Sequence, residues 1–310
     1  MRNNPSPILV TGAHRSGTTW VGKMLATGGE TAYISEPLNI HHRPGVLDVP
    51  TKYWYTYICE QNQSEYLDAF EDTLNFRYHI WEEIKAVRTV KDALRMFRDW
   101  STFLRGKLFN KRPMLKDPFA IFSAPWFQNS FNCQIVIVIR HPAAFVSSLL
   151  RLGWSFELDH LLAQPLLLDN VLQPYREELT ALEMKSDDIV GRGCLLWNLI
   201  YQVVDGFRQE DIQFQLVRHE DLSHNPIEGY SKLFNYLGLH ISEKAARAIS
   251  RSTSAENPKE ISTRKKHSTN LNSVANLENW KHRLTKEEIT SIHELTYETA
   301  SLFYPDSIWE

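Results

Sequence analysis

Residues 7–20 read Pro7-Ile-Leu-Val-Thr-Gly-Ala-His-Arg-Ser-Gly-Thr-Thr-Trp20 and decide the fold class of this chain. The run Pro7–Thr11 is short and apolar, which predicts a buried strand, and the residues from Thr18 to Ala26 predict a helix. Between them, the turn Gly12–Gly17 carries two glycines. Such a turn directs several backbone N–H groups and the positive end of the helix dipole at one point, so it predicts a phosphate-binding loop.

Two further apolar runs repeat the strand-to-helix pattern. Cys133–Ile139 is long enough for a central parallel strand and is followed by Arg140 and a helix to about Leu152. Phe214–Val217 is followed by a helix that opens near Pro226. This alternation predicts an α/β fold of three layers, similar to that of P-loop NTPases, with a central parallel sheet flanked by helices.

The composition is that of an ordinary globular protein. The 310 residues carry 34 Lys and Arg against 37 Asp and Glu, a net charge of −3, so no global attraction to nucleic acid is expected. No stretch approaches the ~18 apolar residues of a membrane span, and the polar start at residues 1–7 does not resemble a secretory signal. Three scattered cysteines form neither a disulfide framework nor a cysteine-rich zinc site, so we expect a cytoplasmic protein.

The glycine-containing turn departs from the nucleotide-hydrolysing motif at one position. Gly12 and Gly17 stand at the spacing of G-x-x-x-x-G-K-[ST], but Thr18 occupies the position of the lysine that reaches the β- and γ-phosphates. Arg15 instead supplies a cation inside the loop. There it would lie near the bridging oxygen of a donor that is shorter than a nucleoside triphosphate. Two alternatives stay open, namely a purely structural turn and a P-loop kinase or NTPase that uses ATP and Mg²⁺.

With these residues in view, the chain resembles a known family. Arg15–Trp20 after an apolar strand is similar to the 5′-phosphosulfate loop of sulfotransferases that use 3′-phosphoadenosine 5′-phosphosulfate (PAPS). The arginine form of this loop is similar to that of Golgi carbohydrate, tyrosylprotein and related bacterial members. The resemblance implies that residues 11–20 hold the 5′-phosphosulfate. The implied donor contacts are Arg15, Ser16, Gly17, Thr18, Thr19 and Trp20.

A second element of the same family spans residues 135–148. The strand that ends in Arg140, with Ser148 eight residues later, resembles the pair that binds the 3′-phosphate of the donor. Two physical reasons support the resemblance. An arginine at the carboxyl end of a parallel strand faces the crevice where such sheets bind ligands. Its guanidinium can donate two hydrogen bonds to one phosphate. The alternatives are that Arg140 caps a carbonyl or pairs with Asp117 or Glu220, and that Ser147 takes the place of Ser148.

Sulfuryl transfer to an alcohol needs a base for the hydroxyl proton and cations for the charge on the leaving phosphate oxygen. Glu36 follows the first predicted helix, and its separation from Arg15 is similar to that of the glutamate taken as the base in tyrosylprotein sulfotransferases. Cytosolic sulfotransferases of animals use a histidine, so His41 or His42 is the alternative. Lys116 opens a Lys-Asp-Pro-Phe stretch that resembles the one whose lysine contacts the transferring group.

Two outer segments complete the sequence-based prediction. Residues 45–110 carry many aromatic side chains, with a helix predicted over Asp92–Leu104, and form either core helices or a wall of the acceptor pocket. Residues 257–279 are polar and basic, which predicts a long mobile loop that acts as a lid. Resemblance to cytosolic and tyrosylprotein members implies further donor contacts by Arg264, Lys265 and Ser252.

Together these inferences predict one sulfotransferase domain over residues 1–310. It would move the sulfuryl group from PAPS to a hydroxyl acceptor by in-line displacement, with no metal required. Glu36 is the expected base, and Arg15 and Lys116 offset the charge of the transition state. A carbohydrate or glycoconjugate is the favoured acceptor, with lipid-linked glycan, phenol and peptide tyrosine left open. A catalytically inactive nucleotide-binding module is a further alternative.

Overall fold

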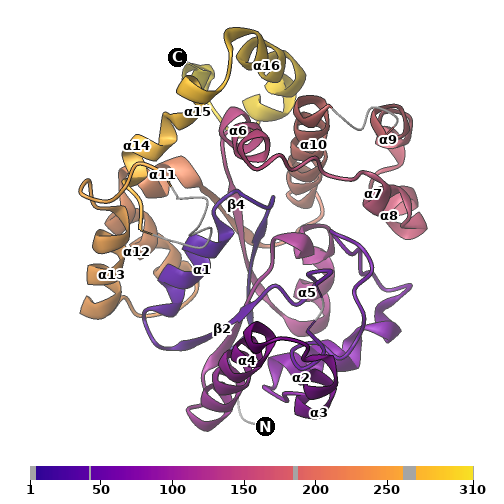
Figure 1. Cartoon of the computed structure of the whole chain (residues 1–310), viewed down its shortest axis with the longest axis vertical. Helices are drawn as coiled ribbons and strands as arrows, with labels where there is room; N and C mark the ends of the chain where they lie inside the picture. The colour runs from indigo at the N-terminus through magenta and orange to yellow at the C-terminus, as the bar shows by residue number, and fades with distance from the viewer. Residues whose placement is uncertain (1–4, 42, 184–187, 261–269, 310) are drawn as a thin grey trace.

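The computed structural model describes residues 5–41, 43–183, 188–260 and 270–309. Five parallel strands form one sheet in the order β2-β3-β1-β4-β5. They are β1 (Ile8–Gly12), β2 (Thr31–Ser35), β3 (Arg112–Lys116), β4 (Gln134–Ile139) and β5 (Phe214–Arg218). Helices pack on both faces of the sheet (Figure 1). The predicted three-layer α/β fold is confirmed.

The helices lie between and after the strands. In the first half they are α1 (Thr18–Ala26), α2 (Leu67–Leu74), α3 (Ile80–Ala86), α4 (Val90–Leu108), α5 (Ala124–Phe131) and α6 (Pro142–Leu152). In the second half they are α7 (Asp159–Leu162), α8 (Pro165–Asn170), α9 (Arg176–Glu183), α10 (Ile189–Phe207), α11 (His219–His224), α12 (Pro226–Tyr236), α13 (Glu243–Thr253), α14 (Ser273–Leu277), α15 (Asn279–Arg283) and α16 (Lys286–Ser301). Short 3₁₀ helices are η1 (Gln63–Glu65), η2 (Pro118–Ser123), η3 (Gln173–Tyr175) and η4 (Asp306–Trp309).

The two faces of the sheet have separate apolar cores because successive strand residues point to opposite faces. On β1, Leu9 packs in one core while Ile8 and Val10 pack in the other, and Ile135 and Val136 on β4 divide in the same way. The first core includes α5, α6 and α10, and the second includes α1, α12 and α13. Each fully buried Ile, Leu or Val contributes about 1.5–3 kcal/mol, so the strands form a stable frame for the loops at their ends.

The register of the sheet brings four segments to one edge. Val10 on β1 aligns with Lys116 on β3, and Lys116 aligns with Ser35 on β2. Gly12 aligns with Val138 on β4. Because the strands are parallel, the loop after β1, the residue after β2, the end of β3 and the residue after β4 all lie at the carboxyl edge. Open α/β sheets bind ligands at this edge.

The sequence analysis missed two of the five strands. β2 begins and ends with a hydroxyl residue, and β3 begins with Arg112, ends with Lys116 and contains Pro113. Neither strand therefore presents the continuous apolar run that marks β1 and β4. Burial of both charged ends of β3 could not be foreseen from the pattern. The chain also forms α11 directly after β5, ahead of the helix predicted near Pro226.

The aromatic residues of the 45–110 insertion do not share one role. Tyr55 is fully buried in the first core, whereas Trp81 and Trp100 are exposed. The core-helix interpretation therefore fails for the two tryptophans of α3 and α4, whereas the pocket-wall interpretation stays a prediction. Within the part of the chain that the structure describes, no helix combines the length and apolar character needed to span a bilayer.

The predicted lid over residues 257–279 is only partly described. Arg264 and Lys265 lie outside the described residues. Farther along, Ser273–Leu277 form α14, in which Leu277 is buried and the Ser273 hydroxyl donates to the carbonyl of Ser223 at 3.0 Å. Residues 273–277 are therefore helical where a loop was expected, and the lid role of the segment stays a prediction.

Candidate functional site

The loop between β1 and α1 needs both of its glycines. Gly12 has φ 140°, and a Cβ there would lie 2.2 Å from the carbonyl oxygen of Val138. Gly17 has φ 105°, and a Cβ there would lie 2.6 Å from Nδ1 of His219. Only glycine adopts these positive φ values without strain and lets the neighbouring backbone and ring approach. The strand, loop and helix predicted from residues 7–26 are all present.

Two buried tyrosines fix the loop in place. The Tyr201 hydroxyl accepts from the amide of Ala13 at 3.3 Å and donates to the carbonyl of Val138 at 2.9 Å. The Tyr55 hydroxyl accepts from the amide of His14 at 3.1 Å. These tyrosines lie 188 and 41 residues from their loop partners, so no local pattern pointed to them. The loop therefore has a defined shape before any ligand binds.

The N-terminus of α1 offers donors to an anion. Gly17 is the N-cap, no side chain caps the helix, and its first turn contains no acidic residue. Thr18 and Ser16 are buried beside these amides, and Thr19 and Trp20 are half-buried. Among the described residues, the Ser16 hydroxyl has no hydrogen-bond partner. Uncapped helix amides and an unpartnered buried hydroxyl are the features expected of a phosphate site.

Arg15 joins the two predicted donor elements. Its Nε donates to the Ser148 hydroxyl at 3.1 Å, across 133 residues of sequence. Arg15 adopts φ 68°, an uncommon value for a residue other than glycine. Burial, followed by the charge of Arg151, lowers the pKa of Arg15 from its ordinary value. Arg151 lies one turn after Ser148 on α6 and was missed by the sequence analysis, although this i to i+3 spacing places the two on one helical face.

Arg140 is enclosed at the same edge of the sheet. One of its terminal nitrogens donates to the carbonyl of Arg15 at 3.2 Å, so the carbonyl-capping alternative is observed. Its Nε is buried and, within the described chain, has no hydrogen-bond partner. Burial lowers the pKa of Arg140 to about 10, even though Glu220 favours the charged form. Arg140 is half-buried as a whole, and a guanidinium with an unused buried donor has capacity for an anionic ligand.

The alternative carboxylate partners of Arg140 have other roles. Asp117 accepts the amides of Leu38 at 2.6 Å and Phe119 at 3.0 Å. Glu220 accepts the amide of His141 and the hydroxyl of Tyr304, each at 3.0 Å. Asp117 is therefore no partner of Arg140, and Glu220 acts on it only as a nearby charge.

Ser147, the alternative to Ser148, is buried next to it. Its hydroxyl has no partner among the residues that the structure describes. Ser148 already accepts from Arg15. Both serines therefore stay available as ligands of a second phosphate.

Glu36 and Lys116 form an ion pair at the ends of β2 and β3. Lys116 Nζ donates to Oε1 of Glu36, and Asn39 donates to Oε2 at 2.8 Å. The Lys116 side chain is 1% exposed, whereas that of Glu36 is 27% exposed. Burial alone would raise the pKa of Glu36, but the charge and hydrogen bond of Lys116 and the bond from Asn39 outweigh it, so the pKa lies below its ordinary value. Glu36 is thus an ionised carboxylate with access to solvent.

Asp117 holds the Glu36 segment by accepting the amide of Leu38. Burial, followed by the charge of Glu36, raises the pKa of Asp117 to about 7. Glu36 itself has φ 50°, and its amide donates to the carbonyl of Lys116 at 2.8 Å. The carboxylate is therefore fixed by contacts on both sides.

The histidines proposed as alternative bases are placed differently. His42 lies outside the described residues. His41 is exposed, and its ring meets Trp54 edge-on at 5.9 Å between centroids. Trp54 also contacts Phe119 and Trp154, at 4.3 and 6.4 Å. These residues form an aromatic cluster that extends to the phosphate loop, because the His14 ring lies 4.6 Å from that of Trp154.

Trp20 and Ser252, predicted separately, are in contact. The Trp20 indole donates to the Ser252 hydroxyl at 3.1 Å, and its ring meets that of His219 at 5.2 Å. On the other side of Arg140, the Trp280 ring stacks on His141 at 4.8 Å with an interplanar angle of 12°. The segment that follows the predicted lid thus packs at the end of β4.

A groove of about 610 Å³ runs between α1, β2 and α4. Glu36 and Lys116 line it from the edge of the sheet, and Thr19 lines it from α1. Helix α4 contributes Arg98, Asp99, Thr102 and Arg105. The ion pair of Glu36 and Lys116 is therefore reached from a cleft with a positively charged wall.

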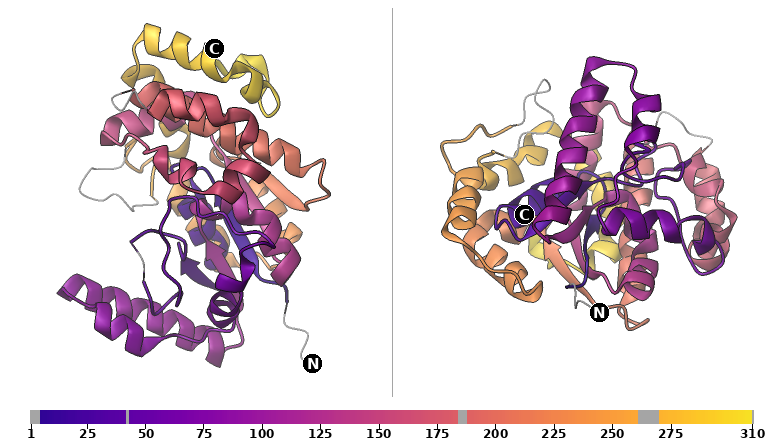
Figure 2. Two further views of the ribbon diagram at one scale, coloured as in Figure 1. Left: turned by 90° about the vertical axis from the view of Figure 1, so that its right-hand side faces the viewer. Right: turned by 90° about the horizontal axis from the view of Figure 1, so that it is seen from below.

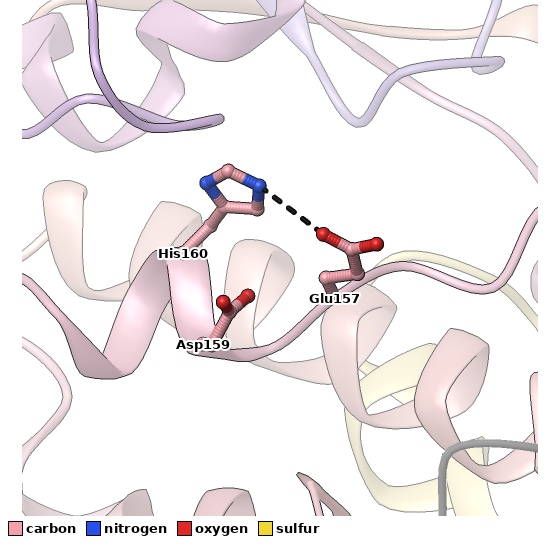
Figure 3. A group of neighbouring side chains, drawn as sticks. All are labelled: Glu157, Asp159 and His160. Atoms are coloured by element: carbon pink, nitrogen blue, oxygen red, sulfur yellow. Dashed lines mark ion pairs between the residues drawn. The ribbon is translucent and has the colours of Figure 1, made fainter.

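A group of potential metal ligands lies after α6. Glu157, Asp159 and His160 place ligand atoms within 4.8 Å of one another (Figure 3). Glu157 and Asp159 are exposed, and Nε2 of His160 lies 3.6 Å from Oε2 of Glu157. Exposed acidic groups of this kind are common without an ion, and we assign no metal role to them.

A sequence model of one family, described as the sulfotransferase domain, matches residues 5–303. The chain belongs to the sulfotransferase family. The predicted family is confirmed, and membership of it supports the predicted enzyme class and the PAPS donor. A stretch of 118 residues is 27% identical to carbohydrate sulfotransferase 1 of Danio rerio. The matched stretch covers 37% of this chain and 25% of that protein, so the match spans about a quarter of the length of carbohydrate sulfotransferase 1.

Solved structures give more distant likenesses. The sulfotransferase domain from the curacin biosynthetic pathway aligns with a TM-score of 0.49 and 14% identity, covering 97% of this chain and 98% of that chain. The mouse sulfotransferase SULT7A1, solved in complex with PAP, aligns with a TM-score of 0.46 and 15% identity, covering 98% of this chain and 86% of that chain.

Proposed function

We propose that the carboxyl edge of the sheet holds PAPS between the loop after β1 and the end of β4. The observation that carries the proposal is the hydrogen bond from Arg15 to Ser148, which joins the two donor elements at 3.1 Å. Around it, Ser16, Arg140 and Ser147 each keep an unpartnered buried polar atom, counted over the described residues. PAPS carries one phosphate at the 5′ position and one at the 3′ position of its ribose. Two neighbouring sets of hydrogen-bond donors match this arrangement.

The proposed donor contacts divide between the two phosphates. The amides of Gly17, Thr18 and Thr19 face the 5′-phosphosulfate, because anions bind at uncapped helix N-termini. Arg140 and Ser148 face the 3′-phosphate, since a guanidinium forms charge-assisted hydrogen bonds to phosphate oxygens. Trp20 and Ser252, already in contact, border the donor on the α13 side. Contacts by Arg264 and Lys265 stay predictions.

The proposed reaction is a single in-line displacement. The acceptor oxygen forms a bond to sulfur while the bond between sulfur and the bridging phosphate oxygen breaks. Glu36 takes the acceptor proton, which suits a carboxylate that is ionised and accessible. Lys116 and Arg15 offset the negative charge that develops on the leaving oxygen. The pair between Lys116 and Glu36 keeps base and cation at the same point.

We further propose a carbohydrate or glycoconjugate as the acceptor. The aromatic cluster of Trp54, Phe119 and Trp154 extends to His14 of the phosphate loop. Trp54 and Trp154 are half-buried, so each leaves ring surface open to a ligand. Sugar rings pack on such apolar surfaces while their hydroxyls stay free to react. The partial match to a carbohydrate sulfotransferase agrees with this choice.

Residues 1–310 would then act as one sulfotransferase domain, with the 45–110 insertion on the acceptor side. A match to the family over residues 5–303 supports this proposal. The cytoplasmic location stays a prediction.

The test of the base uses Glu36→Gln with Glu294→Gln as the matched control on the exposed side of α16. Glutamine keeps the shape and the bond from Lys116 but accepts no proton, so turnover with PAPS should fall about 10²–10⁴-fold while affinity for the donor product stays unchanged. Glu294→Gln should leave turnover unchanged. Equal turnover in Glu36→Gln and the wild type would contradict the proposal, and loss of activity in His41→Ala would move the role to that histidine.

A further inference from the structure

Helices α3 and α4 expose a large apolar surface. On α4, the side chains of Val90, Leu94, Phe97, Leu104 and Leu108 recur at spacings of three, four and seven, which places them on one side of an α-helix. Leu94 is 67% and Phe97 is 63% exposed. Trp81 of α3 is 74% exposed. In the left view of Figure 2, this pair of purple helices projects from the rest of the chain. We call this surface the α3–α4 face.

The opposite side of α4 is firmly attached to the protein. Phe103 and Asp99 are buried, and Arg43 donates to Asp99 at 2.5 Å. Gly106 packs so closely on Phe76 that a Cβ would lie 2.6 Å from its ring. A capping box between Thr89 and Asp92 fixes the start of the helix. The apolar stripe is therefore held outward by the fold, although its burial would stabilise the protein.

Positive charge surrounds the stripe. Residues 80–111, which span α3 and α4, contain eight Lys and Arg against four Asp and Glu, a net charge of +4 in a chain whose net charge is −3. The eight cations are Lys85, Arg88, Lys91, Arg95, Arg98, Arg105, Lys107 and Lys111. Arg95 and Arg98 pair with the two aspartates, and Lys85 pairs with Glu82. Lys91 and Lys107 are exposed and, over the described ranges, have no ion pair.

We propose that the α3–α4 face docks on an anionic lipid bilayer. An apolar stripe with aromatic side chains, flanked by Lys and Arg, is the pattern of helices that lie in a membrane interface, where the apolar side enters the lipid and the cations meet the headgroups. A second copy of this chain is a poor partner, because like charges would face each other. A nucleic acid leaves the apolar stripe exposed to water. An anionic bilayer satisfies both features at once.

The docking face has a consequence for the acceptor, and this step rests on the proposed function. Arg98, Thr102 and Arg105 of α4 line the groove that reaches Glu36 and Lys116. Docking therefore brings the entrance of this groove close to the lipid headgroups. The acceptor class that fits is a glycolipid or lipid-linked glycan, whose hydroxyl groups are presented at the bilayer surface.

The test is sedimentation of the full chain with vesicles. One set is phosphatidylcholine alone, and the other contains equal parts of phosphatidylcholine and phosphatidylglycerol. We expect binding to the second set only, and its loss at about 1 M salt, where the Debye length falls to about 3 Å.

Leu94→Ser with Phe97→Ser should weaken vesicle binding at least about 10-fold, and Lys91→Glu with Lys107→Glu at least about 25-fold. The controls are Leu295→Ser with Tyr297→Ser on α16, and Lys232→Glu with Lys244→Glu on α12 and α13.

Several results would overturn the docking proposal. They are absence of binding to either vesicle, equal binding to both, or binding that survives both stripe variants. A concentration-dependent dimer that Leu94→Ser with Phe97→Ser abolishes would assign the face to a second copy. Oligonucleotide binding that depends on Lys91 and Lys107 alone would assign it to nucleic acid. Calorimetry with adenosine 3′,5′-bisphosphate on the same variants separates the two proposals, because donor-product binding reports on the fold and the donor site and needs no lipid.

Discussion

The donor site and the α3–α4 face both gather cations, but they differ in burial. Arg15, Lys116 and Arg140 are held at fixed positions by neighbouring backbone and side chains. Lys91 and Lys107 extend into solvent from a helix surface. Fixed, desolvated cations recognise a small anion of defined shape, whereas mobile exposed cations respond to the total charge of a broad surface. In the two proposals, the same residue types thus serve two kinds of recognition within one nearly neutral chain.

The largest expected change in nucleotide affinity concerns Arg140. Arg140→Ala removes two or more charge-assisted hydrogen bonds of about 1.5 kcal/mol each, so affinity for adenosine 3′,5′-bisphosphate should fall about 10²-fold. Arg88→Ala makes the same chemical change on the exposed face and should leave this affinity unchanged. Isothermal titration measures both variants, with thermal melts to confirm that each is folded.

Equal losses in the two variants would contradict the distinction, because they would mean that general charge, rather than a fixed position, holds the nucleotide. Vesicle binding gives the reciprocal comparison. Arg140→Ala should leave it unchanged, since Arg140 is enclosed by the protein.

The smallest expected effect concerns pH. The pKa of Glu36 lies below its ordinary 4.5, because the charge and hydrogen bond of Lys116 outweigh the effect of burial. The ion pair therefore stabilises the fold above about pH 4.5, and this contribution is lost as pH falls through the lower folded value. The protonation of Glu36 should change turnover less than about twofold between pH 5.5 and 8, because Glu36 stays ionised over this range. Asp117, whose pKa is raised to about 7, titrates within the same range. A histidine base would instead give an acidic limb near pH 6.5.

A pH–rate profile of kcat distinguishes these cases. A fall in kcat centred near pH 6.5 that disappears in His41→Ala would contradict the role of Glu36. A flat profile that keeps its height in His41→Ala would agree with it.

The sequence predicted the parts of the fold that depend on local pattern. β1 and β4 were found because their apolar runs are continuous, β5 because its apolar run is interrupted only by Gln215, and the glycine loop because its spacing is fixed by chemistry. β2 and β3 were missed because their burial depends on neighbours, not on their own composition. Lys116, which the sequence allows as a solvated lysine before a turn, is almost fully buried against Glu36. Tertiary contacts therefore decided what composition left open.

The candidate site divides in the same way. Arg15, Ser148 and Arg140 were named from motifs, and the structure brings them together. Tyr55 and Tyr201, which hold the loop, and Arg151, which affects the pKa of Arg15, were not named. Contacts across many residues of sequence leave no local signature. The exposed stripe of α4 was also missed, because its helical period is equally typical of a core helix.

The most direct test of the central claim is calorimetric titration of the full chain with adenosine 3′,5′-bisphosphate and, separately, with ATP and Mg²⁺. The account predicts tight binding of the bisphosphate, since one set of donors faces each phosphate, and much weaker binding of ATP, which has no 3′-phosphate for Arg140. Preference for ATP with Mg²⁺, or bisphosphate binding that is unchanged in Arg140→Ala, would contradict it.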